Sequence, residues 1–134
     1  MIHKLSKIQE LREQEQKLLA EKQKEEDPLL SDTSLLPQLY EWFSESTGSL
    51  PDKDKVTRRR EFLFIALFLY SPKTLVCGHL PKGLRDILTS IFAPIKKSSI
   101  SNDVKYLLFN FKQYKGFRES VGDSYKYIIG KLNP

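Results

Sequence analysis

Residues 84–111, LRDILTSIFAPIKKSSISNDVKYLLFNF, decide the predicted fold, because they hold two apolar patterns of helical period on either side of a proline. The first pattern predicts a helix over about 84–93, which Pro94 ends. The second pattern predicts a helix over about 99–114. That helix has the clearest amphipathic pattern in the chain, and its inward face is formed by Ile100, Val104, Leu107, Leu108 and Phe111. The stretch therefore predicts a short helix, a tight basic turn and a longer amphipathic helix.

A buried helix is expected before this stretch. Residues 58–70, RRREFLFIALFLY, become continuously apolar after the arginines, which is typical of the central helix of a domain. Asp54 or Thr57 is suited to cap its start, and Ser71-Pro72 ends it. A last helix over about 117–132 is expected to pack across the back of the bundle.

Shorter segments connect these helices. Residues 35–46 predict a short helix that covers the core, and one face of it is apolar: Leu36, Leu39, Tyr40 and Phe43. Residues 28–34 and 47–52 predict linkers rich in turn-forming residues. Residues 73–83 predict a loop whose two glycines allow positive φ, with a short strand over 74–77 as the alternative.

The N-terminal segment 1–26 contains neither Gly nor Pro and is rich in strong helix formers, so it predicts a helix that an Asp-Pro pair ends. A coiled-coil seam that begins at Ile8 and Leu11 would place Glu15 and Lys22 at the next a positions, which breaks the seam. Three interpretations stay open for this helix: self-association, docking on the rest of the protein, or ordering by a partner protein.

Charge is distributed unevenly along the chain. Residues 1–52 hold six Lys or Arg against eleven Asp or Glu, a net charge of −5. Residues 53–134 hold sixteen against six, a net charge of +10. A basic region of this kind predicts an anionic partner such as nucleic acid, and a solvated basic surface is the alternative.

The cysteine content and the hydropathy favour a soluble, cytoplasmic protein. The single cysteine excludes an internal disulfide, and a reducing compartment fits best. The first residues lack the apolar core of a signal peptide. The longest apolar run, 62–70, is far shorter than the roughly 17 residues that a membrane span needs, so no membrane partner is expected.

Catalysis and metal binding are not expected from the sequence. Cys77 and His79 lie close together, but zinc needs about four ligands and the only other histidine is His3 in a remote helix. The chain has no Ser-His-Asp set, no paired catalytic carboxylates and no phosphate-binding glycine loop. We therefore expect neither an enzyme nor a cofactor, and no small-molecule substrate.

The basic turn and the start of the helix over 99–114 are the candidate contact surface for double-stranded DNA. With the apolar residues turned inward, Asn102 and Lys105 point outward and Ser101 lies at the flank. Asn can bond adenine and Lys can bond guanine, each with roughly 1–3 kcal/mol of discrimination. Lys96 and Lys97 are placed to meet phosphates. A further phosphate contact is predicted at the start of the buried helix: Arg58, Arg59 and Arg60.

Plain structural roles are the alternative for several of these residues. Ser98 or Ser99 is suited to cap the helix, and Asp103 suits the positive end of the helix dipole. Asn102 and the serines would then only solvate the helix. Phe109 is expected to pack under the helix over 117–132.

The segment TSIFAPIKKSSISNDVKYLL resembles the helix-turn-helix family, in which a small or apolar helix end is followed by a polar turn and then S-x-I-S-x-D-V-x-x-L. Pro94 occupies the turn, which lacks the glycine common in the family. The resemblance implies five DNA contacts: Ser98, Ser99, Ser101, Asn102 and Lys105. Residues 58–132 are also similar to short proteins of Bacteroidetes phages and mobile elements, through RRREFLFIALFLYSP, GLRD and YLLFNFKQYKGFRESV. This resemblance implies the cytoplasm of a bacterial or phage-infected cell as the setting and no particular activity.

We therefore expect an all-α protein with a helix-turn-helix-like bundle and an N-terminal helical extension. The expected divisions are a helix over 1–27, a linker with a short helix over 28–52 and the bundle over 53–134. The first functional hypothesis is a small DNA-binding protein, such as a phage or mobile-element regulator that dimerises or recruits a protein through residues 1–26. The alternative is a phage structural or adaptor protein, located in the virion, whose helices form protein contacts.

Overall fold

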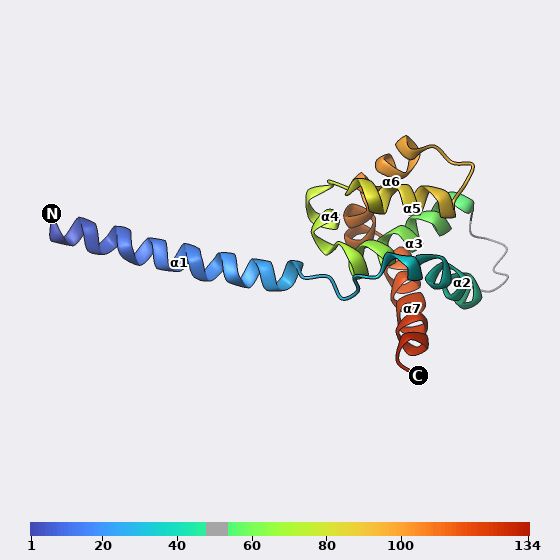
Figure 1. Ribbon diagram of the computed structural model, residues 1–134, viewed down its shortest axis with the longest axis horizontal. Helices are drawn as coiled ribbons and strands as arrows, with labels where there is room; N and C mark the ends of the chain where they lie inside the picture. Colours follow the sequence, from blue (N-terminus) through green and yellow to red (C-terminus); the bar gives the residue numbers. More distant parts are fainter. Residues whose placement is uncertain (48–53) are drawn as a thin grey trace.

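Every regular element in the computed structural model, which describes residues 1–47 and 54–134, is helical (Figure 1). The α-helices, in chain order, are α1 (Ile2–Glu26), α2 (Leu36–Thr47), α3 (Lys55–Tyr70), α4 (Pro72–Cys77), α5 (Lys82–Ile91), α6 (Lys97–Gln113) and α7 (Lys115–Leu132). A single 3₁₀ turn, Thr33–Leu35, precedes α2. The predicted all-α fold is confirmed, with no strand among the described residues.

Helix α3 runs through the middle of the body, which we define as α2 to α7. It packs on α2, α4, α6 and α7, and every side chain from Phe62 to Leu67 is buried. Burying one large apolar side chain contributes roughly 1.5–3 kcal/mol, so this run organises the core. Its start is capped by Asp54, whose carboxylate accepts a hydrogen bond from the backbone N–H of Thr57 at 2.6 Å. The prediction of a central buried helix is confirmed.

Helix α2 belongs to the same core as the later helices. Leu36, Leu39 and Phe43 are at most 1% exposed, and α2 packs mainly on α7. The preceding segment is tied to the end of α3, because the hydroxyl of Tyr70 donates to the carbonyl of Asp32 at 2.7 Å. The predicted boundary at residue 53 therefore separates segments that share one core. The predicted linker 47–52 begins with the last residue of α2, and its other residues lie outside the described part of the chain.

The predicted loop over 73–83, with its alternative of a strand over 74–77, is wrong for its first half. Helix α4 begins there, with Pro72 at its first position, where a missing N–H costs nothing. Gly78 ends the helix in the left-handed conformation, with φ of 77°. Because six residues make less than two turns, this helix leaves no apolar period in the sequence.

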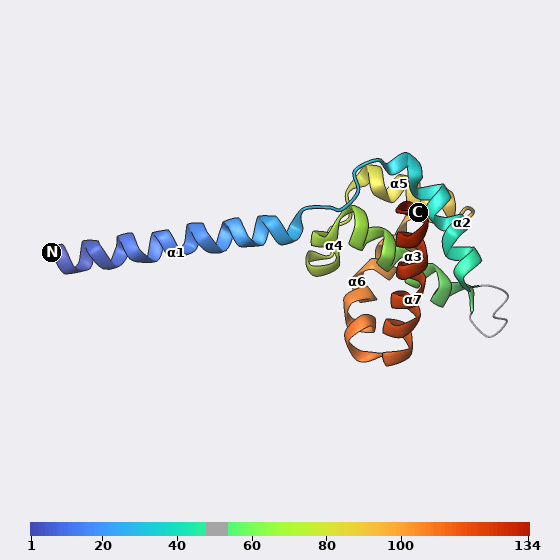
Figure 2. The same ribbon diagram turned by 90° about the horizontal axis from the view of Figure 1, so that it is seen from below.

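Helix α6 begins two residues earlier than predicted. Lys96 occupies the N-cap position and makes no side-chain cap, so the expected capping by Ser98 or Ser99 is wrong. A turn over residues 92–96 separates α6 from α5, which packs on α2 and α6. Helices α6 and α7 follow each other with only Tyr114 between them and lie side by side in Figure 2. The predicted succession of short helix, basic turn and long amphipathic helix is present.

Helix α1 stands away from the body in both views (Figures 1 and 2). None of its side chains is buried, so the docked interpretation is wrong. Its large apolar side chains are all at least 46% exposed: Met1 at its N-cap, then Ile2, Leu5, Ile8, Leu11, Leu18 and Leu19. None of the described helices is long and apolar enough to cross a bilayer.

Candidate nucleic-acid interface

The two faces of α6 are oriented as the apolar pattern predicts. Ile100, Val104 and Leu107 are at most 2% exposed and pack into the core. On the opposite side, Ser98, Asn102 and Lys105 are exposed; they follow one another at i, i+4 and i+7 and so form one stripe along the helix. Two further candidates, Ser99 and Ser101, are half-buried at the flanks of this stripe. We call Ser98, Asn102 and Lys105 the α6 stripe.

The side chains of the α6 stripe have no hydrogen bond or ion pair within the described part of the chain. The same holds for Lys96, which is exposed in the turn just before α6. Their amide, hydroxyl and ammonium groups therefore face water and are available to an external partner. Three of the predicted residues thus share one side of the helix, and Lys96 is exposed just before its first turn.

Lys97 lies at the first position of α6 and is paired within the protein. Its Nζ lies 2.8 Å from Oδ1 of Asp86 on α5, and both side chains are about half-exposed. The hydrogen bond from Lys97 lowers the pKa of the Asp86 carboxyl. Because an exposed pair of this kind contributes little stability, it links the two helices across the turn without fixing Lys97 strongly.

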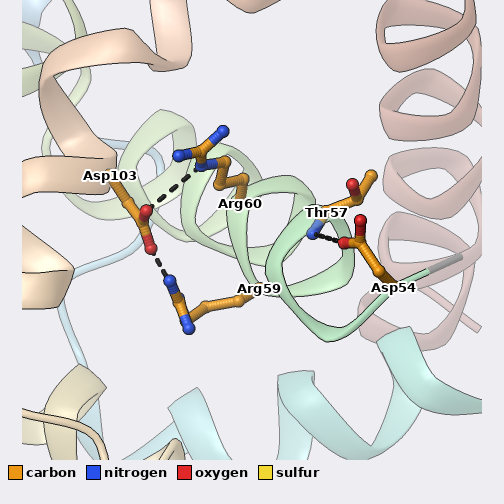
Figure 3. Close-up of polar contacts among 5 residues, drawn as sticks. All are labelled: Asp54, Thr57, Arg59, Arg60 and Asp103. Carbon is orange, nitrogen blue, oxygen red and sulfur yellow. Dashed lines mark hydrogen bonds and ion pairs between the residues drawn. The ribbon is translucent and has the colours of Figure 1, made fainter.

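Asp103 lies inside the protein between two arginines of α3 (Figure 3). Nε of Arg59 donates to Oδ2 of Asp103 at 2.5 Å, and Nε of Arg60 donates to Oδ1 at 3.1 Å. The Asp103 side chain is 4% exposed, against 13% for Arg59 and 35% for Arg60. The expectation that Asp103 serves the helix dipole is wrong, because the seventh residue of α6 lies beyond its first turn. The carboxylate instead joins α6 to α3.

The third arginine of the cluster also has an internal contact. The guanidinium of Arg58 donates to Oγ1 of Thr47 at 2.8 Å, which joins α3 to the end of α2. The structure thus gives Arg58, Arg59 and Arg60 packing roles that the sequence analysis did not identify. Their contact with phosphates stays a prediction. The Arg59 side chain, at 13% exposed, is more enclosed than that of Arg60, at 35%.

Phe109 extends the solvent-facing side of α6 beyond the α6 stripe. It is 55% exposed and meets the edge of the Tyr114 ring at a centroid distance of 6.2 Å. The expected packing under α7 is wrong, because Phe111 fills that place by stacking on Phe64 at 4.5 Å. Tyr106 on the same helix is 54% exposed. The outward side of α6 therefore combines polar residues near its start with aromatic residues farther along.

No group of three His, Cys, Asp or Glu side chains that could hold a metal ion occurs within residues 1–47 and 54–134. Comparison with protein-family models, with curated proteins and with solved structures finds no match to this chain. The features of this chain that bear on function are the α6 stripe, the charge distribution and the cavities of the body.

Proposed function

We propose that this protein binds duplex DNA through the exposed side of α6. The carrying observation is the α6 stripe, in which Ser98, Asn102 and Lys105 share one exposed side and have no internal partner among the described residues. An amide and an ammonium group at this spacing suit the edges of adenine and guanine in the major groove, each worth roughly 1–3 kcal/mol of discrimination.

Phosphate contacts are assigned to the turn that precedes α6. Lys96 is exposed there, and Lys97 is held near it by the exposed pair with Asp86. Such contacts position a protein on the duplex without reading its sequence. The net charge of +10 over residues 53–134 supports association with a polyanion. Regulation of a phage or mobile element is the setting that we propose for this binding.

The experiment is a titration of a mixed-sequence DNA duplex of about 30 base pairs at several salt concentrations. The native chain is compared with the double variant Lys96→Ala/Lys105→Ala. Each lost phosphate contact flattens the slope of log K against log[salt] by about 0.9, so the double variant is expected to flatten it by up to about 2. If Lys105 contacts a base instead, the decrease is about 1 and the affinity falls at every salt concentration.

The control is Lys126→Ala/Lys131→Ala, which removes the same charge from the C-terminal half of α7. That half lies at the far end of the body from the turn between α5 and α6 (Figure 1). The control is expected to keep most of the native slope. Equal slopes for the two double variants, or no binding by the native chain at low salt, would refute the proposal.

A second candidate function is a phage structural or adaptor protein that uses its helices for protein contacts. It is favoured by the exposed aromatic residues of α6 and by α1, whose apolar side chains have no cover in the described structure. Most helical stability in proteins comes from packing of an apolar face, and α1 has no buried side chain, so a partner or a second copy would stabilise it. Light scattering of the purified chain distinguishes the two kinds of partner for α1. Pairing with a second copy doubles the measured mass, whereas a helix that needs a foreign partner leaves the purified chain a monomer.

A further inference from the structure

A cleft of about 510 Å³ lies between the first turns of α3 and the turn that connects α5 to α6. One side carries three cationic side chains: Lys55, Arg58 and Arg59. The other side is apolar, with Phe92, Pro94 and Ile95 from the turn. Among the described residues that line the cleft, none is acidic. Three cationic groups thus line one concave site, and Asp103 balances the charge of one of them, Arg59.

Internal contacts hold two of these cations in position at the cleft. Arg59 is fixed through its Nε to Asp103, and its two terminal nitrogens make no hydrogen bond or ion pair with the described residues. Arg58 is oriented by its hydrogen bond to Thr47. Lys55 is exposed at the first position of α3. Guanidinium groups that are already oriented lose little freedom when they bind a tetrahedral anion, and they suit phosphate geometry.

We infer that this cleft binds a phosphate group. Its position indicates the source, because Ile95 lines the cleft and the next residue, Lys96, begins the proposed DNA contact. A duplex whose major groove receives α6 would bring a backbone phosphate beside Lys96 to the cleft, with the sugar against Pro94. This assignment to a backbone phosphate rests on the proposed function, whereas a free phosphate would need only the cleft.

Two measurements on the full chain test the inference, with Lys55→Ala as the variant. Lys73→Ala is the control, because Lys73 is likewise exposed in the first turn of a helix, α4, and does not line the cleft. In the DNA titration, Lys55→Ala is expected to flatten the salt slope by about 0.9, the value for one phosphate, and Lys73→Ala to leave it unchanged.

The second measurement adds inorganic phosphate to ¹⁵N-labelled protein at constant ionic strength. Saturable shift changes are expected for the amides of residues 55–59 and 92–96, and they should weaken at least threefold in Lys55→Ala. A changed salt slope without these shifts identifies the ligand as a DNA backbone phosphate. The shifts without a changed slope identify it as a free phosphate.

The failure of the proposed function can be told apart from the failure of this inference. A native chain that does not bind DNA but shows localised phosphate shifts refutes the proposed function and supports the cleft. A native chain that binds DNA with equal slopes for Lys55→Ala and Lys73→Ala, and without localised phosphate shifts, overturns the cleft alone. The absence of both DNA binding and localised shifts overturns both.

Discussion

Asp103→Asn is the sharpest test of how the body holds together. The carboxylate accepts hydrogen bonds from Arg59 and Arg60 on different oxygens and is almost fully buried. Asn has nearly the same shape, but one of its two terminal atoms is an NH₂ donor. One guanidinium would then face a donor, and the buried negative charge that balances both arginines would be gone.

The expected loss in the free energy of unfolding is about 3 kcal/mol. Removing one partner of a buried ion pair typically costs roughly 3–5 kcal/mol. Arg59 is enclosed enough for this range to apply, whereas Arg60 is 35% exposed and its share is reduced by water. For a folded body of about 100 residues, 1 kcal/mol shifts the melting temperature by roughly 4 °C, so a decrease of about 12 °C follows.

Urea denaturation and thermal melting followed by circular dichroism measure this loss. The matched control is Asp123→Asn, the same chemical change at an exposed position of α7. The control is expected to stay within about 0.5 kcal/mol of the native chain. A loss for Asp103→Asn as small as that of the control would refute the conclusion that the Asp103 pairs join α3 to α6.

Three other perturbations have defined outcomes. The hydrogen bond from the Thr57 amide lowers the pKa of Asp54 below its ordinary value of 3.8. The stability advantage of the native chain over Asp54→Ala is therefore complete above pH 3.8 and is lost as the pH falls through the lowered pKa. Urea denaturation at about pH 7 and pH 2 measures this advantage, and an equal advantage at both pH values would contradict the cap. Phe109→Ser is expected to leave the melting temperature nearly unchanged, whereas Leu107→Ala on the buried side of α6 is expected to lower the free energy of unfolding by about 2–5 kcal/mol. Similar losses of stability in the two variants would contradict the orientation of α6. Deletion of residues 1–27 is expected to leave the melting temperature of the body unchanged at low protein concentration, because α1 has no buried side chain, and a large decrease would show that α1 supports the body.

The orientation of α6 could be predicted because its signal is local. Ile100, Val104 and Leu107 recur at helical spacing, and this alone fixes which side is buried. The central position of α3 was predictable for a related reason, since a helix that is apolar on all sides is stable only when neighbours cover most of its surface. Helix α4 was missed because six residues give no period, and only Pro72 and Gly78 marked its two ends.

The pairing of Asp103 with Arg59 and Arg60 could not be predicted from local patterns. The partners lie more than forty positions apart in sequence and meet only because α3 packs on α6. A signal was nevertheless present: Asp103 lies at i+3 from Ile100, within the apolar face. A carboxylate at such a position needs a buried cation, which points to the three consecutive arginines of the chain.

The exposure of Phe109 also depended on packing. The apolar pattern placed Phe111 on the inward face, where it stacks on Phe64 of α3, whereas the cover expected for Phe109 depends on where α7 lies. Internal partners of the predicted DNA contacts also depend on packing, since Lys97 lies opposite Asp86 and the arginines lie opposite Asp103 and Thr47. Ser98, Asn102, Lys105 and Lys96 are the predicted contacts that are exposed and have no internal side-chain partner among the described residues.

The most direct test of the central claim is a map of the surface that DNA touches. ¹⁵N-labelled full-length protein is titrated at low salt with the mixed-sequence duplex, and amide shifts are followed residue by residue. We expect the largest changes over residues 96–105, fading as salt is added, and little change in the C-terminal half of α7. No change at low salt, or changes centred on α1 or on α7, would contradict the assignment of DNA binding to α6.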